Sequence, residues 1–401
     1  MAAQKKLLLL GGSHYLRPVI REAHALGIHV VTCDYLPDNP AHKLSDEYRN
    51  VSIIDREAVL DTARELGIDG VMSFACDPGV VTAAYVAEKL GLPFPGSFES
   101  VSILQDKGRF RAFLREHGFP VPRAKRYTDP AEAMADAADY PWPMIVKPVD
   151  SAGSKGVTRV ENAQELAAAI PHALAFSLGK AFIVEQFIQQ KGYSSDTDCF
   201  STDGELVYCS FDEQRFDRAA ENPYTPAAYT WPSTMPEDIQ RQLRADIQRL
   251  LRLLDMKTGV YNIETRQGTD GRPYIMELSP RGGGNRLCEV LEMASGTKLI
   301  QNAVKAAVGL PVEPMSDPVY RGHWAEIILH SDRDGRFREL WIDPALQSSV
   351  VQVDLWVGPG DAVERFSGAN KAVGTLVMNF PDRASLEKYM ADDSWYRLLT
   401  D

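Results

Sequence analysis

Strands and helices alternate through the first hundred residues, and this alternation constrains the fold more than any other feature. Three apolar runs have the length and composition of buried strands: residues 7–10, 28–33 and 70–74. Helical segments follow them, each ended by a glycine: 16–26 by Gly27, 56–66 by Gly67 and 78–90 by Gly91. Such alternation predicts βαβ units and a parallel sheet, in which ligands bind beyond the carboxyl ends of the strands.

The rest of the chain predicts a mixed arrangement, so the fold class is α/β with α+β character in the C-terminal part. Pro93, Pro95 and Gly96 mark a domain boundary near residue 95, and a helix carrying Asp106-Lys107 follows. Strands are predicted at 144–149, 182–187, 259–264 and 273–278, helices at 162–176 and 383–391, and a hairpin at 193–211.

One stretch rich in Pro, Tyr and Trp, residues 222–235, is predicted to be a loop. A loop of this length is either a lid or substrate wall, or a packed surface loop. Thr234 and Glu237 predict a capping box for the helix that follows, whose apolar residues recur on one face from Ile239 to Leu254.

Composition excludes several classes of protein. Of 401 residues, 44% are hydrophobic and 24% are charged, which is typical of a globular chain. The net charge of -12 does not suit a dedicated nucleic-acid binder. The five cysteines are scattered without a CxxC pair, and no apolar run is long enough to span a membrane. We therefore expect a cytoplasmic protein without nucleic-acid or membrane partners.

A Ser/Gly loop, residues 150–156, follows the strand that carries Lys147. Small residues let backbone N–H groups approach phosphate oxygens, and Lys147 and Lys155 supply positive charge. The Walker order of residues is missing, and a solvated turn is the alternative interpretation.

Two acidic residues lie on strands that a glycine turn separates. Glu264 and Glu277 could share one face of an antiparallel pair, where a cation such as Mg²⁺ would relieve their repulsion. Two solvent-facing acids are the alternative. The second acidic strand is followed by Ser279-Pro-Arg281-Gly-Gly-Gly-Asn285. The arginine can bind a carboxylate or phosphate in bidentate fashion, and the glycines allow a ligand to approach the backbone closely.

Together and in this order, these motifs resemble the ATP-grasp superfamily of carboxylate–amine ligases, in the branch of L-amino acid ligases and of carbamoyl-phosphate-synthase-like and biotin-carboxylase-like enzymes. The resemblance runs from Lys107 to about Arg286. It implies an N-terminal domain at 1–95, an ATP-grasp domain at 96–310 with a mobile lid at about 125–188, and a C-terminal α+β region at 311–401.

The resemblance also implies a role for each matching residue. ATP would be contacted by Lys107, Lys147, Ser151, Gly153, Ser154, Lys155, Gly156, Glu185, Gln186, Phe187 and Ile188. Magnesium, which manganese can replace, would be held by Glu264, Glu277 and Ser279. Arg281 and Lys147 would be catalytic, and substrate would meet Arg281, Gly282, Gly283 and Asn285.

Two residues depart from the family pattern. The family often has Glu before a Tyr-Ser pair, where it contacts the ribose, but Gly192 stands before Tyr193 here; Asp196 or Asp198 would be the first candidates to replace it. The family usually has Asn where this chain has Ser279, a weaker oxygen ligand.

The implied activity is an ATP-dependent ligase that activates a carboxylate as an acyl phosphate, releases ADP and joins the carboxylate to an amine. Both substrates would be small molecules, an amino acid among them, and a homodimer is left open. A carboxylase or amide ligase acting on bicarbonate or a sugar-nucleotide would share the nucleotide site. A non-catalytic nucleotide-binding module and a nicotinamide oxidoreductase are alternatives from other classes. Against the oxidoreductase, this chain lacks the G-x-G-x-x-G spacing, and Glu264 and Glu277 would have no role in such an enzyme.

Overall fold

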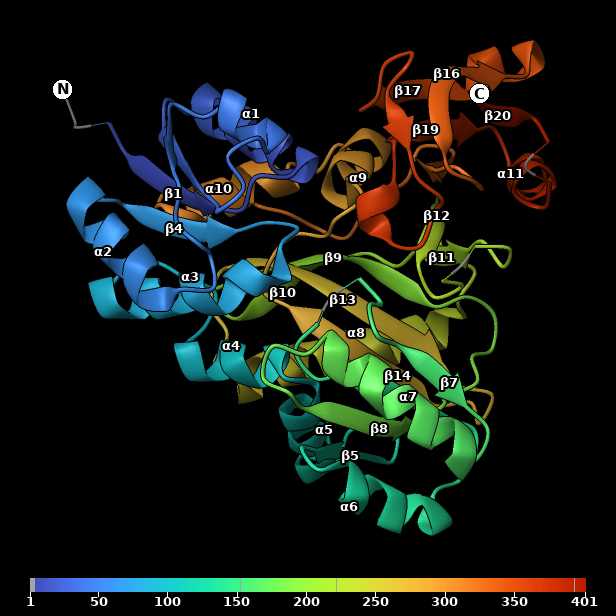
Figure 1. Ribbon diagram of the computed structural model, residues 1–401. Helices are drawn as coiled ribbons and strands as arrows, with labels where there is room; N and C mark the ends of the chain where they lie inside the picture. Colours follow the sequence, from blue (N-terminus) through green and yellow to red (C-terminus); the bar gives the residue numbers. More distant parts are fainter. Residues whose placement is uncertain (1–3, 152, 221, 393) are drawn as a thin grey trace. The chain divides into compact units, whose positions relative to one another are not determined.

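The computed structural model describes residues 4–151, 153–220, 222–392 and 394–401 (Figure 1). The chain divides into two compact units, each built from three segments. Unit 1 comprises residues 1–126, 197–210 and 236–318, and unit 2 comprises residues 127–196, 211–235 and 319–401. The sequence predicts domains as continuous stretches, and their bounds remain predictions.

Unit 1 begins with the predicted parallel sheet, in the order β3-β2-β1-β4. Its elements are β1 Lys6–Leu10, α1 Arg17–Ala25, β2 His29–Cys33, β3 Glu47–Arg49, α2 Arg56–Leu66, β4 Gly70–Ser73 and α3 Asp77–Leu90. Side chains of α2 and α3 form a buried cluster with one face of the sheet. Successive residues of β1 are almost all buried, which is typical of a parallel strand covered on both faces.

The second sheet of unit 1 has the order β10-β9-β13-β14. Its strands are β9 Ser195–Thr202, whose first two residues belong to unit 2, β10 Glu205–Cys209, β13 Gly259–Gln267 and β14 Pro273–Ser279. The helices of this part are α4 Phe98–Gln105, α5 Lys107–Glu116, α8 Glu237–Leu253, α9 Leu287–Ser295 and α10 Leu299–Ala307. The predicted hairpin at 193–211 and the two strands around the Gly268–Gly271 turn are confirmed.

Unit 2 contains one sheet in the order β5-β8-β6-β7 and another in the order β11-β12-β15-β19-β17. The first is built from β5 Ala124–Tyr127, whose first three residues belong to unit 1, α6 Pro130–Ala135, β6 Met144–Pro148, β7 Thr158–Val160, α7 Ala163–Ala175 and β8 Phe182–Gln186. The second is built from β11 Glu213–Phe216, β12 Pro226–Trp231, β15 His323–Leu329, β17 Val350–Leu355 and β19 Gly374–Phe380. A smaller sheet and a helix complete the unit: β16 Gly335–Ile342, β18 Ala362–Val363, β20 Tyr396–Thr400 and α11 Arg383–Met390.

The structure corrects the loop predicted at 222–235, because β12 lies within it and pairs with β11 and β15. Tyr229 and Trp231 are buried inside the sheet rather than exposed on a lid or surface loop. The last four residues of β12 are all buried, so the strand lacks the alternation of buried and exposed residues that reveals a half-buried strand. The prolines of this stretch predict a loop, and no alternating pattern in the sequence indicates the strand.

Two smaller predictions are also wrong. The predicted capping box does not form, because α8 begins at Glu237 without a side-chain cap and Thr234 donates instead to the buried carboxylate of Glu213. The predicted single helix around Asp106 is two helices, α4 and α5. Asp106 ends the first and caps the second through Arg109 N–H.

Candidate functional site

The two candidate metal-binding carboxylates are direct cross-strand partners. Glu264 of β13 lies opposite Glu277 of β14 in the antiparallel register. Like charges in such a pair repel each other. In the structure each has a cation: Arg266 pairs with Glu264, and Lys107 Nζ lies 3.4 Å from Glu277 Oε1. The predicted adjacency of the two acids is therefore confirmed.

This arrangement suits a hard divalent cation. The side chains of Glu264 and Glu277 are 27% and 36% exposed, so solvent reaches their oxygens. Within the ranges described, no cluster of three or more His, Cys, Asp or Glu could hold a metal by itself. Magnesium binds through one or two carboxylates with phosphate and water oxygens completing the shell, and two facing glutamates fit that pattern.

Ser279, the third candidate ligand, is already engaged. It lies opposite Asn262 in the register and is buried. Its hydroxyl donates to Asp77 Oδ1 at 2.9 Å and accepts from Gln105 Nε2 at 2.9 Å. A metal would have to compete for this oxygen, and its role as a ligand remains a prediction.

Arg281 has a partner that the sequence analysis missed. Its Nε and Nη2 donate to the two oxygens of Asp77, at 2.7 and 2.6 Å, and its Nη1 donates to Asn262 Oδ1 at 3.2 Å. Although burial would raise the pKa of Asp77, the Arg281 guanidinium holds it below its usual range. Asp77 is the first residue of α3, just beyond the carboxyl end of β4, and that position was the only signal in the sequence.

The glycine turn after Arg281 is mostly buried. Gly282 and Gly283 are buried, and a Cβ at Gly282 would come within 2.3 Å of the Phe74 ring. Asn285 adopts a positive φ of 50° and accepts a hydrogen bond from Tyr15 Oη at 2.9 Å. Only Gly284 of the turn is partly exposed. The turn therefore packs against the N-terminal sheet region, and direct substrate contact by its buried members remains a prediction.

In unit 2, two of the candidate ATP contacts pair with each other. Lys147 Nζ on β6 lies 2.5 Å from Glu185 Oε1 on β8, and Glu185 is buried. The strands are antiparallel, and Ile145 rather than Lys147 is directly opposite Glu185, so the long lysine reaches along the sheet. In this pair the buried carboxylate of Glu185 offsets the charge of the Lys147 ammonium group.

The loop at 150–156 is anchored at two points, and Ala152 lies outside the described residues. Asp150 accepts from Ser177 Oγ at 2.8 Å and from Gly179 N–H at 2.7 Å. Ser154, at a positive φ of 57°, donates to Tyr224 O at 2.9 Å. Ser151 is partly exposed, Gly153 and Lys155 are exposed, and Gly156 is buried. Positive φ at Gly153, Ser154 and Gly156 produces the tight turn that a phosphate-binding loop needs.

The segment proposed to read adenine covers the end of β8 and the two residues after it. Gln186 and Phe187 are partly exposed and Ile188 is buried. Phe187 N–H donates to Pro143 O at 3.1 Å, and Arg159 lies 4.6 Å from the centre of the Phe187 ring. The bond from Phe187 N–H occupies one of the backbone donors proposed for the base.

Of the two acids proposed to replace the missing ribose contact, one is buried. Asp198 is 0% exposed, and burial raises its pKa to about 6. Asp196 is partly exposed and accepts from Gln214 Nε2 and Tyr229 Oη, both at 3.3 Å. Asp196 therefore stays a candidate, whereas Asp198 serves another purpose.

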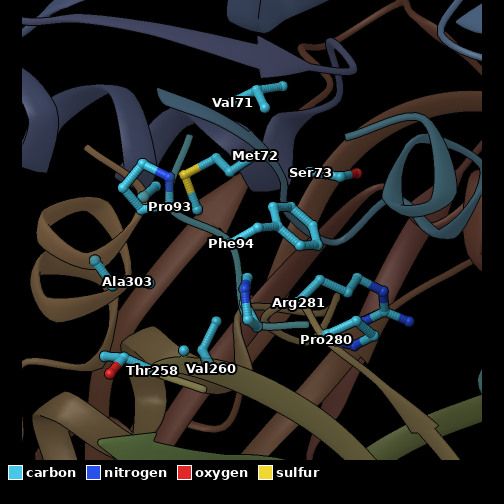
Figure 2. A pocket seen from close by; sticks show the side chains of 14 residues that line it. Val71, Met72, Ser73, Pro93, Phe94, Thr258, Val260, Pro280, Arg281 and Ala303 are labelled. Atoms are coloured by element: carbon cyan, nitrogen blue, oxygen red, sulfur yellow. The ribbon is translucent and has the colours of Figure 1, made fainter. Parts of the chain in front are cut away.

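A narrow apolar pocket lies behind Pro280 and Arg281 in unit 1 (Figure 2). Its volume is about 30 Å³, room for one or two water molecules. Met72, Pro93 and Phe94 line it, and the Arg281 guanidinium points away from them. The pocket is too small for an organic substrate and does not belong to the acidic site.

Comparisons with known proteins show which family the chain resembles. Residues 140–289 match the model of the ATP-grasp domain, and residues 20–94 match that of the ATP-grasp N-terminal domain. The chain is 27% identical over 357 residues to the uncharacterized protein y4rH of Sinorhizobium fredii, covering 85% of this chain and 71% of that protein.

Solved structures show the same fold. An L-amino acid ligase from Bacillus licheniformis is 20% identical, with a TM-score of 0.81 and full coverage (100%) of both chains. A phosphoribosylglycinamide synthetase from Anaerococcus prevotii is 18% identical, with a TM-score of 0.76 and 100% coverage of both. An N5-carboxyaminoimidazole ribonucleotide synthetase from Thermotoga maritima is 17% identical, with a TM-score of 0.75, covering 99% of this chain and 100% of that one. In the described part of the chain, no helix has the length and apolar character to cross a membrane.

Proposed function

The chain belongs to the ATP-grasp superfamily, and from that premise we propose that it is an ATP-dependent ligase that joins a small carboxylate to an amine. The observation that carries the proposal is the Glu264–Glu277 pair, with Lys107 beside it and Arg281 just beyond the same strand. A non-catalytic module would have no need to keep two repelling acids opposite each other. An amino acid is the substrate class we propose first.

The reaction has two steps. A carboxylate oxygen attacks the γ-phosphorus of ATP, the bond to the β–γ bridging oxygen breaks, and an acyl phosphate and ADP result. The amine then attacks the acyl carbon, phosphate leaves, and the amine loses a proton. Residues of the chain act mainly by position and charge, as is general for phosphoryl transfer. Magnesium, held by Glu264 and Glu277, would offset charge on the phosphate oxygens.

Spent nucleotide tests this mechanism. The purified protein, with ATP, Mg²⁺ and a matrix of amino acids and small carboxylates, should release ADP and inorganic phosphate in equal amounts. Ion-exchange chromatography measures the nucleotide, and mass spectrometry identifies the amide. The Glu277→Gln variant, prepared in parallel, controls for contaminating ATPase. AMP and pyrophosphate as the main products would exclude the acyl phosphate.

Lys147→Ala should weaken ATP binding, because it removes one charge-assisted contact to the nucleotide. Such a contact contributes about 1.5–3 kcal/mol to binding, so Kd should rise roughly 10- to 150-fold. Calorimetry with ATP and Mg²⁺ measures this. The substitution also leaves buried Glu185 without its ammonium partner, which itself destabilises unit 2.

The double variant Lys147→Met with Glu185→Gln separates the two effects, because it removes both charges. It should melt near the wild type and still bind ATP weakly. Wild-type affinity in the double variant would place Lys147 outside the nucleotide site.

A further inference from the structure

Asp198 is a buried carboxylate that the proposed reaction does not use. It lies on β9 and is 0% exposed. Its Oδ1 accepts from Gly283 N–H at 2.8 Å and from Asn262 Nδ2 at 3.3 Å, and its Oδ2 accepts from the Cys288 thiol at 2.9 Å. A buried carboxylate is costly, so its three donors indicate what it stabilises.

Those donors come from three separate segments: Asn262 from β13, Gly283 from the turn and Cys288 from α9. An ionised carboxylate offers about four acceptor positions, so one group can hold all three segments at once. The approach is close, because a Cβ at Gly283 would lie 3.0 Å from Asp198 Oδ1. That Cβ would also meet Leu287 Cδ1 at 2.6 Å and Asn262 Nδ2 at 2.9 Å, so the close packing around this position requires glycine.

The contacts continue to Arg281. Asn262 donates to Asp198 with its nitrogen and accepts from Arg281 Nη1 with its oxygen, at 3.2 Å. Arg281 Nη1 also donates to Gly282 O at 2.9 Å, and Gly282 O accepts from Ala75 N–H at 3.0 Å. Asp77 holds the opposite side of the guanidinium. The plane of the guanidinium is thus fixed from two sides.

We propose that Asp198 is a positioning residue, which orients Arg281 through Asn262 and fixes the glycine turn through the Gly283 N–H. The inference rests on the proposed function in one respect, namely that Arg281 acts on substrate. Asp198 itself touches no ligand, because it is fully buried.

Two substitutions at this residue test the proposal. Asp198→Leu keeps the number and branching of the side-chain heavy atoms and removes every acceptor; kcat for ADP release should fall at least about tenfold, while Kd for ATP stays within about twofold. Asp198→Asn keeps one oxygen for Gly283 and Asn262, and its kcat should stay within about threefold of the wild type. This rescue by the conservative variant would not follow from a general loss of stability.

Val290→Ala is the matched control, because Val290 is a buried apolar residue of α9 and has no hydrogen-bonding side chain. It should lower the melting temperature without changing kcat. If Asp198→Leu does not fold, Asn262→Leu removes the side chain that joins Asp198 to Arg281, and it should reproduce the fall in kcat with unchanged ATP affinity. Wild-type kcat in the folded variant would overturn the proposal.

Amide hydrogen exchange gives a readout that needs no substrate. Residues 282–287 should exchange faster in Asp198→Leu than in the wild type or in Val290→Ala. Unchanged exchange would overturn the positioning role, and faster exchange with wild-type kcat would overturn its link to activity. If the wild type releases no ADP with any substrate pair, the proposed function fails, and the exchange comparison still decides whether Asp198 holds the turn.

Discussion

Glu277→Gln should abolish measurable turnover, a loss of at least about a hundredfold, the size that follows when one electrostatic contact at a reacting group is removed. The amide keeps the shape of the side chain and removes the charge that would bind Mg²⁺. Glu264, directly opposite, would then carry the cation alone. Steady-state ADP release measures the loss.

The fold should tolerate this change. Glu277 is 36% exposed, and its pair with Lys107 at 3.4 Å is worth about 1 kcal/mol or less at such exposure. Removing one of two facing acids also relieves repulsion on the hairpin. A thermal melt should therefore stay close to that of the wild type.

A control and a second readout make the result specific. Asp270→Asn, in the turn at the other end of the β13–β14 hairpin, disturbs the same hairpin through its bonds to Arg272 and Tyr274 and should keep kcat. Binding of Mn²⁺ with nucleotide, followed by electron paramagnetic resonance, should weaken in Glu277→Gln. Turnover within about threefold of the wild type would mean that Glu277 is not a metal ligand.

Arg281→Lys is expected to lower kcat on the order of a hundredfold with near-normal ATP affinity. Lysine keeps the charge but loses the planar fork that can hold two oxygens at once. The nucleotide phosphates would still meet Lys107 and Lys147. The contact between Arg281 and the substrate oxygens should strengthen as charge develops in the transition state, so its loss should lower kcat.

The structure also supplies a competing explanation, because Arg281 is 9% exposed and forms a two-pronged pair with Asp77. If Arg281 only links α3 to the turn, Arg281→Lys would lower the melting temperature and leave kcat at low temperature unchanged. Arg286→Lys is the matched control: Arg286 is 6% exposed and pairs with Glu289. It should lose stability and keep kcat. If kcat is the same in Arg281→Lys, Arg286→Lys and the wild type, Arg281 is not a catalytic residue.

Local patterns in the sequence determined the parallel sheet of unit 1 and the hairpin that carries the two acids. Glycines that end helices and apolar runs between them act over a few residues, so βαβ units could be read directly. The turn at Gly268–Gly271 predicts that the two strands pair. A register shift between Thr265 and Glu264 then brings Glu277, rather than Met276, opposite Glu264.

Contacts between distant parts of the chain were decided only by the tertiary structure. The strand within 222–235 depends on β11 and β15 to either side of it, and β15 lies about a hundred residues away in sequence. Asp77 meets Arg281 across 204 residues. The buried carboxylate of Asp198 accepts a hydrogen bond from the backbone N–H of Gly283 rather than from solvent. No local pattern encodes such partners, because a buried charge or strand edge is satisfied by whichever donor the fold brings to it.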